Sequence, residues 1–242
     1  MSALYALLFG LAVAVYGYLI GGVSFARLIA KHHGVDITAV GSHNPGGTNV
    51  WRTLGWKAGL SCMLLDMVKG FLAAFIPLVI VLFVPGLADA FGGMNFLGAS
   101  HISIFACVGG FFAALGHSFP IYYRFRGGKN VMVTCGFLLA VSPILMLFGL
   151  ICFLLALLFS HKVAIGSITA AVAVSAGGIV IAVITTLGLT GFQYLGMNLG
   201  GSHYFLFDWI ALLVILSSCI FVVIRHRSNI QKIASGQSRK DF

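Results

Sequence analysis

The sequence predicts an all-α integral membrane protein of about seven transmembrane helices, folded as one domain over residues 1–242. Of its residues, 60% are hydrophobic and 8% are charged, whereas a soluble domain carries roughly 25% charged residues. The mean hydropathy is +1.07, and apolar stretches near the roughly 20 residues that a membrane helix needs recur along the chain. This composition excludes a soluble globular domain, a disordered chain and a nucleic-acid-binding protein, although the formal net charge is +9.

Five apolar stretches each predict one membrane span: residues 2–25, 60–84, 98–115, 163–187 and 208–224. No basic residue precedes Arg27, so the first stretch is expected to be a retained helix rather than a secretory signal. Residues 131–160 are harder to assign, because 30 residues in one helix would reach about 45 Å. Pro143 lies near their middle and breaks or kinks a helix, which favours two short segments and seven in all.

The distribution of basic residues decides the topology. With seven spans, all 14 Lys and Arg residues fall on one side, which the positive-inside rule identifies as cytoplasmic. The loops at 85–97 and 188–207, on the other side, contain none. With six spans, Lys162 and the basic tail from about Arg225 would lie on opposite sides. We therefore expect the N-terminus outside and the C-terminus in the cytoplasm, where the tail can rest on anionic lipid headgroups.

The acidic and sulfur-containing residues predict no metal site. All five acidic residues are Asp, spread from Asp36 to Asp241, and the five Cys lie inside apolar runs without a CxxC pair. Metal centres need clustered ligands, so the cysteines are expected to pack. Asp66 and Lys69 stand three residues apart in a predicted span, where a charge needs a partner, and we expect them to form a structural ion pair.

The first polar loop, residues 40–52, predicts an anion-binding site. Its glycines and small residues expose backbone N–H groups just before a helix-forming stretch, an arrangement that binds phosphate. If that stretch is helical, Arg52 shares a face with Thr48 and Asn49. An ordinary glycine-rich turn is the alternative. The predicted contacts in this loop are Ser42, Asn44, Gly46, Gly47, Thr48, Asn49 and Arg52.

The second polar loop, residues 116–130, predicts a second phosphate contact at Gly127, Gly128 and Lys129, with Arg126 a weaker candidate. A Walker A loop needs GxxxxGK followed by Ser or Thr, and this loop does not fit it. Basic residues that only mark the cytoplasmic face are the alternative, and His117 could be an interfacial cap.

Two further polar segments lie near the end of predicted spans. Ser167 follows the junction at Lys162. His226 and Asn229 stand three apart and would share a helical face, unless the tail is only a stop-transfer cluster. His203 and Asp208 match HxxxxD, a motif of soluble-type glycerolipid acyltransferases, but they lie on the side without basic residues and without a second motif. We interpret that match as chance.

The polar loops together resemble the motifs of the PlsY family, the acyl-phosphate:glycerol-3-phosphate acyltransferases. Residues 17–52 resemble the first motif region, 66–70 the DxxKG segment, 116–129 the second motif, and 226–236 the C-terminal signature. The matches run in family order over about residues 17–236. The chain departs from the family's pattern at five positions: His43 and Asn130 replace Gly, Arg126 replaces Lys, Ala164 replaces Ser, and His161 replaces Arg.

The resemblance implies a multi-pass protein of the bacterial inner membrane with its site facing the cytoplasm. It implies transfer of a fatty acyl group from acyl phosphate to glycerol 3-phosphate, giving lysophosphatidic acid and phosphate without a metal or coenzyme. Expected partners are acyl phosphate, glycerol 3-phosphate, membrane lipids and an enzyme that forms acyl phosphate. The residues expected to catalyse are Ser42, Arg52, Lys129, His226 and Asn229; those expected to bind substrate are Asn44, Gly46, Gly47, Thr48, Asn49, His117, Arg126, Gly127, Gly128 and Ser167.

Both expected substrates are phosphates, which fits the N–H groups and cations of the loops. Acyl phosphate is already activated, so the protein needs to supply proximity and charge stabilisation rather than a covalent intermediate. The base is either His226 or the phosphate of glycerol 3-phosphate. A transporter of an organophosphate anion is the alternative function, although transporters place their sites near the bilayer midplane. A CDP-alcohol phosphotransferase would need an Asp-rich metal motif, which the chain lacks.

Overall fold

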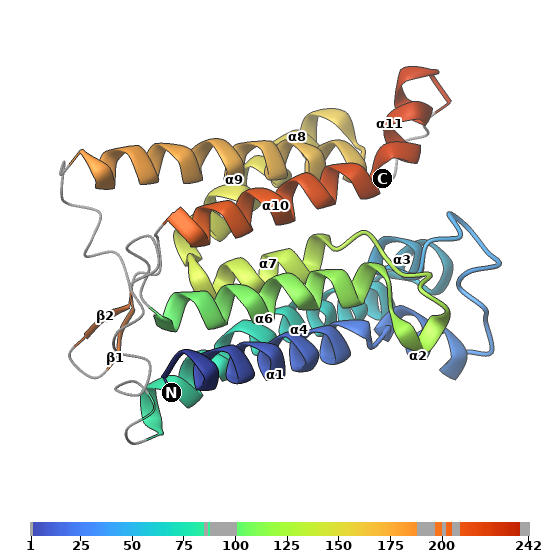
Figure 1. The fold of residues 1–242 in the computed structure, drawn as a ribbon. Helices are drawn as coiled ribbons and strands as arrows, with labels where there is room; N and C mark the ends of the chain where they lie inside the picture. Colours follow the sequence, from blue (N-terminus) through green and yellow to red (C-terminus); the bar gives the residue numbers. More distant parts are fainter. Residues whose placement is uncertain are drawn as a thin grey trace.

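The structure, a computed structural model, describes residues 2–84, 87, 101–187, 197–199, 202–204 and 209–237. Within these ranges the regular secondary structure is helical apart from one small hairpin (Figure 1). The helices are α1 (Ser2–Gly22), α2 (Phe25–His32), α3 (Gly47–Leu54), α4 (Trp56–Phe83), α6 (His101–Ser118), the 3₁₀ turn η1 (Ile121–Tyr123), α7 (Val131–Val141), α8 (Pro143–Ser160), α9 (Val163–Thr186), α10 (Trp209–Arg225) and α11 (Arg227–Ala234).

The hairpin was not predicted. Strand β1 (Met197–Leu199) pairs antiparallel with β2 (Ser202–Tyr204) between α9 and α10. Three-residue strands carry too little alternation to be recognised in a glycine-rich loop. The chance HxxxxD match begins at His203 in β2, and its Asp208 lies outside the described residues.

The membrane helices agree with the expected apolar stretches. Among the described residues, five spans are long and apolar enough to cross a bilayer, in α1, α4, α6, α8 and α9. Helix α10 qualifies as a sixth when it is joined to α11, from which a 52° bend separates it, and α7 is a shorter apolar helix. The protein is therefore a multi-pass membrane protein.

The predicted break in residues 131–160 is confirmed. Helix α7 ends at Val141, Ser142 takes a non-helical conformation, and Pro143 is the first residue of α8. Proline suits that position because its missing N–H would have no intrahelical partner there. The first predicted span ends earlier than expected, at Gly22, because Ser24 starts a separate short helix by accepting a hydrogen bond from the Arg27 N–H at 3.4 Å.

The helices pack in two groups. Helix α6 packs against α1, α4 and α7, while α9 packs against α8 and α10; α10 also contacts α6 and α7. Phe137, Leu145 and Ile215 are buried where α7, α8 and α10 meet. In α1, Gly17 and Gly21 let the helix approach the backbone of Gly109 and Ala113 in α6, as small residues do between membrane helices.

One end of the bundle gathers the polar loops. Helices α2, α3 and α11 lie at that end, and the hairpin lies at the other (Figure 1). A buried cluster of Ala26, Ile37, Val50 and Cys62 fixes α2, the following loop and α3 against α4. This packing holds the first polar loop beside the ends of α7 and α10.

Candidate functional site

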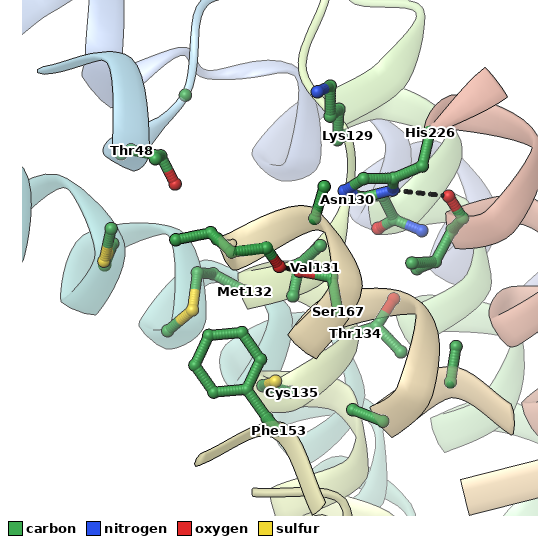
Figure 2. Close-up of a pocket in the computed structure, with 18 of the residues that line it drawn as sticks. Thr48, Lys129, Asn130, Val131, Met132, Thr134, Cys135, Phe153, Ser167 and His226 are labelled. Carbon is green, nitrogen blue, oxygen red and sulfur yellow. Dashed lines mark hydrogen bonds between the residues drawn. The ribbon is translucent and has the colours of Figure 1, made fainter. Parts of the chain in front are cut away.

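A cavity of about 970 Å³ opens among α3, α4, α7, α8, α9 and the α10–α11 junction. Twelve of the fifteen residues expected at the site line it, although they come from segments up to 187 residues apart in the sequence. They are Ser42, Asn44, Gly46, Gly47, Thr48, Asn49, Arg52, His117, Lys129, Ser167, His226 and Asn229. Figure 2 shows part of this cavity, with Thr48, Lys129, Ser167 and His226 around it.

Asn49 organises the first polar loop. Its side chain is 1% exposed. The amide oxygen accepts a hydrogen bond from the Ser42 N–H at 2.9 Å, and the amide nitrogen donates to the carbonyls of Ile37 at 3.0 Å and Val40 at 3.1 Å. Gly41 has φ +60°, and a side chain there would collide with the Asn49 amide. Asn49 thus shapes the loop that presents Ser42.

The start of α3 faces the cavity. Gly46 is extended, and the helix begins at Gly47 without a side-chain cap. The N–H groups of a first helical turn and the helix dipole attract anions. Thr48 and Arg52, one turn apart, both line the cavity, as expected from a shared helical face.

Lys129 and Asn229 meet across the cavity mouth. The Lys129 ammonium donates a 2.8 Å hydrogen bond to the Asn229 Oδ1. This contact joins the residue just before α7 to α11. It brings together two residues that the sequence separates by 100 positions.

His226 lies just beyond the end of α10 and is neutral near pH 7. Burial lowers the pKa of its imidazole to about 4; the charges of Lys129 and Arg225 act in the same direction, and a hydrogen bond to Val222 opposes them. The Nδ1 atom lies 2.8 Å from the Val222 carbonyl, a bond drawn in Figure 2. A carbonyl only accepts, so we assign the proton to Nδ1, which leaves Nε2 as a hydrogen-bond acceptor.

A buried polar cluster supports the cavity from α4 and α6. Lys69 Nζ lies 2.7 Å from Asp66 Oδ1 and 2.9 Å from His117 Nδ1, and it donates to the Val23 carbonyl at 2.6 Å. The expected ion pair of Asp66 and Lys69 is therefore confirmed. Because the ammonium only donates, His117 Nδ1 accepts and its Nε2 carries the proton. Both Asp66 and His117 reach the cavity wall.

Three predicted contacts do not line the cavity: Arg126, Gly127 and Gly128. The carbonyls of the two glycines accept hydrogen bonds from Arg225, at 3.0 and 3.2 Å, and the Arg126 carbonyl accepts one from Arg27 at 3.0 Å. A side chain at Gly128 would collide with the His117 ring. This segment does not reach the cavity and instead fixes the backbone that precedes Lys129. From the sequence, the whole run had been interpreted as a phosphate-binding loop.

Sequence reasoning also missed much of the wall. On α7 the missed residues are Val131, Met132, Thr134, Cys135 and Leu138, and just before it Asn130; on α9 they include Val163, Ala170, Ala171 and Val174. Apart from Met132, the residues of each helix recur at three- and four-residue spacing, which puts them on one helical face. Membrane helices are apolar all round, so this period does not stand out in the sequence. Lys162 and Lys232 add charge at the mouth.

The deeper part of the cavity is apolar, with Leu138, Met146, Phe153, Val174 and Cys219 in its wall. A cavity with cations at one end and an apolar shaft at the other suits an amphiphile with an anionic head. The fold and site thus define a multi-pass membrane protein with a cavity suited to an anionic, lipid-like molecule.

Comparison with known proteins narrows this class to one family. The family model for glycerol-3-phosphate acyltransferase matches residues 11–236. The chain belongs to this family and is a membrane-embedded acyltransferase that acts on glycerol 3-phosphate, as the resemblance of its loop motifs implied.

Individual relatives agree. The glycerol-3-phosphate acyltransferase of Chlorobaculum tepidum is 37% identical, with 95% of each chain covered. That of Salinibacter ruber is 35% identical over 93% of this chain and 89% of its own. The crystal structure of PlsY, an integral membrane glycerol 3-phosphate acyltransferase, in its glycerol 3-phosphate form superposes with a TM-score of 0.72 at 28% identity, covering 96% of this chain and 94% of PlsY. Its lysophosphatidic acid form gives 0.70.

Proposed function

We propose that the protein transfers a fatty acyl group from an acyl phosphate to glycerol 3-phosphate, giving 1-acyl-glycerol 3-phosphate (lysophosphatidic acid) and phosphate. This is the first acylation of bacterial phospholipid synthesis. The observation that carries the proposal is a cavity that joins four cations, Arg52, Lys129, Lys162 and Lys232, to an apolar shaft. Such a cavity holds two phosphates at its mouth and an alkyl chain below them.

The transfer needs positioning more than covalent help. The glycerol hydroxyl oxygen attacks the acyl carbonyl carbon, and the carbonyl π electrons move onto its oxygen. When the C=O bond re-forms, the bond from carbon to the phosphate oxygen breaks and phosphate leaves with the electron pair. A neighbouring group takes the hydroxyl proton. Holding the two reactants together supplies much of the acceleration, and cations stabilise the charge on the leaving phosphate.

The site residues are proposed to divide this work. The loop of Ser42, Asn44, Gly46, Gly47 and Thr48 and the cation Arg52 bind the acyl-phosphate group. Lys129 neutralises the leaving phosphate, and Ser167 adds a hydroxyl. His226 and Asn229 position glycerol 3-phosphate. Neutral His226, with Nε2 unprotonated, is suited to take the hydroxyl proton, and the phosphate of glycerol 3-phosphate is the other candidate.

Asn49 and His117 are proposed to act through the residues they hold, since the Asn49 amide and the His117 Nδ1 bond within the protein. For Arg126, Gly127 and Gly128 we propose the same indirect role, because their carbonyls hold Arg225 and Arg27. No metal or cofactor enters the proposed chemistry.

We further propose that residues 1–242 form one domain in the bacterial inner membrane, with seven crossings, the N-terminus outside and the site and C-terminal tail facing the cytoplasm. Helices α2, α3 and α11 lie at the same end of the bundle (Figure 1) and carry Arg27, Lys31, Arg52, Arg227 and Lys232, which supports this orientation. A water-soluble glycerol 3-phosphate would then reach the site from the cytoplasm. An enzyme that forms acyl phosphate is the expected functional partner.

The test is phosphate release by purified protein given palmitoyl phosphate and glycerol 3-phosphate. We expect release that requires both substrates and yields lysophosphatidic acid. Arg52→Ala is expected to lose at least about 100-fold in kcat/KM, in the range seen when a transition-state charge partner is removed. Lys57→Ala, which removes an exposed cation lying over Trp56, is the matched control.

Two other outcomes would change the proposal. Acyl transfer from palmitoyl-CoA but not from palmitoyl phosphate would keep the reaction and overturn the donor. Glycerol 3-phosphate binding without transfer from either donor would favour the transport alternative.

A further inference from the structure

In the part of the chain that the structure describes, two polar side chains of the cavity wall have no hydrogen-bond partner. Asn130 is 1% exposed and Thr134 is 6% exposed, and both line the cavity. Among the described residues, neither amide atom of Asn130 nor the hydroxyl of Thr134 has a hydrogen-bond partner. A buried polar group left unpaired costs about 1–3 kcal/mol. Their burial without a partner is therefore explained best by a ligand that bonds them.

The backbone presents the two side chains together. Asn130 caps the start of α7 with φ 72°, and the Thr134 N–H donates to its carbonyl at 2.9 Å. Residues four apart in a helix share a face, with an axial rise of about 6 Å. Figure 2 shows both side chains in the cavity wall. In the sequence, Asn130 directly follows Lys129.

Their position matches one part of an acyl donor. The cavity presents cations at its mouth, including Arg52 and Lys129, and an apolar wall deeper in, including Leu138 and Met146. Asn130 and Thr134 begin the helix that runs from Lys129 toward Leu138, so these neutral groups lie between the two regions. An acyl phosphate carries an anionic head, then a carbonyl, then an alkyl chain. Aligned with the cavity, its carbonyl falls at the neutral pair.

We propose that Asn130 and Thr134 are catalytic residues that donate hydrogen bonds, from Nδ2–H and Oγ1–H, to the carbonyl oxygen of the acyl group. The inference rests on the proposed acyl transfer. As the glycerol hydroxyl oxygen bonds to the carbonyl carbon, the π electrons move onto this oxygen, and the two donors stabilise the negative charge. The charge returns to the C=O bond when phosphate leaves. Hydrogen-bond donors that are already in place for a developing oxyanion supply a large part of the rate acceleration in many enzymes.

Asn130 also offers a clean substitution. It is one of the positions where the chain departs from the family's glycine, so the side-chain donor is a feature of this chain rather than of the motif. Glycine adopts a φ of 72° without strain. Asn130→Gly therefore removes the carboxamide while leaving the turn that starts α7 at least as favourable.

The kinetic test compares matched variants. Asn130→Gly and Thr134→Val are each expected to lower kcat by about 10- to 100-fold, the value of one hydrogen bond to a charged group, with the KM for glycerol 3-phosphate changed less than about threefold. Thr134→Ser keeps the hydroxyl and is expected to retain activity. Thr169→Val, on an exposed face of α9, is the control.

A binding test isolates the carbonyl. A β-ketoalkyl phosphonate resembles an acyl phosphate but cannot transfer its chain, and the alkyl phosphonate of equal length lacks the carbonyl. The wild-type protein is expected to prefer the keto compound by about fivefold or more, in line with one neutral hydrogen bond. In Asn130→Gly with Thr134→Val, the two compounds are expected to bind alike.

The outcomes separate this inference from the proposed function. Wild-type kcat in both single variants, together with a retained preference for the keto compound, overturns the roles of Asn130 and Thr134 and leaves the acyltransferase intact. A wild-type protein that transfers no acyl group overturns the proposed function instead. The phosphonate pair then still decides whether the two side chains contact a carbonyl.

Discussion

Lys129 Nζ donates to Asn229 Oδ1 at 2.8 Å and so ties the start of α7 to α11. Helix α11 bends away from α10 by 52° and contains no buried residue. Its position over the cavity therefore depends on few contacts, of which this hydrogen bond is one. The bond also orients the ammonium, whose long side chain has several rotamers.

Asn229→Ala is expected to remove this hydrogen bond to Lys129 and to loosen α11. We expect kcat/KM for glycerol 3-phosphate to fall about 10-fold, since a hydrogen bond to a charged group contributes about 1.5–3 kcal/mol. Asn229→Asp keeps the contact, but its carboxylate offsets the positive charge of the ammonium. We therefore expect kcat/KM to fall at least as much in this variant. Steady-state kinetics measure both, with Ser228→Ala, an exposed neighbour outside the cavity wall, as control. Full activity in Asn229→Asp would argue against a phosphate-binding role for Lys129.

The buried pair of Asp66 and Lys69 is expected to matter for stability. Their side chains are 5% and 2% exposed, and both lie inside α4. Removing one partner of a buried ion pair typically costs about 3–5 kcal/mol, because the other charge remains uncompensated. Lys69→Met should therefore unfold in detergent at a markedly lower temperature than wild type.

A second variant tests whether the uncompensated Asp66 carboxylate causes this loss of stability. Lys69→Met combined with Asp66→Asn removes both charges and should recover part of the lost stability. Lys31→Met, an exposed lysine on α2, is the control for losing one positive charge. A double variant no more stable than Lys69→Met would mean that packing, rather than the uncompensated carboxylate, carries the loss.

The glycines of α1 should differ sharply in their tolerance of alanine. At Gly21 a Cβ would collide with the backbone of Ala113 in α6, whereas at Gly10 it would lie 3.6 Å from the Phe105 ring, an ordinary contact. We expect Gly21→Ala to destabilise the protein by about 1–3 kcal/mol, the usual cost of overpacking, and Gly10→Ala to be nearly neutral. Thermal unfolding of the two variants in the same detergent measures this, and equal midpoints would contradict the close approach.

Much of the site could be predicted from the sequence because its polar residues stand out in an apolar chain. Ser42, Thr48, Arg52, Lys129, His226 and Asn229 are all in polar islands, and all line the cavity. The positive-inside rule and Pro143 likewise predicted the helices of residues 131–160. The family resemblance of the loops then assigned the activity.

The remainder depended on tertiary structure. Nothing in the local sequence distinguishes Lys129, which lines the cavity, from Gly127 and Gly128, which do not line it and only support the backbone before Lys129. Asn49 looked like a ligand because it lies beside Thr48, yet its amide bonds to the loop. The apolar wall on α7 and α9 is hidden because lipid and cavity both select apolar residues, so only packing shows which face is which.

His226 gives the protein a stability that depends on pH. Burial, together with the charges of Lys129 and Arg225, lowers the pKa of its imidazole from 6.5 to about 4 in the folded protein. Between these values the unfolded chain binds a proton that the folded protein does not, so acidification favours unfolding. This loss of folding stability is absent above about pH 6.5 and reaches its full size below about pH 4, where it amounts to about 3 kcal/mol for a pKa shift of this order.

His226→Asn removes the titrating group, so its stability should lack this dependence. We expect the stability difference between wild type and His226→Asn to shift against wild type as the pH falls from 7 to 4.5. Unfolding midpoints measured across that range, with His32→Asn as the exposed-histidine control, give the comparison. A difference that stays constant with pH would show that His226 titrates alike in the folded and unfolded chain. In that case it would be largely protonated below pH 6, and the proton-accepting role proposed for Nε2 would fail at that pH.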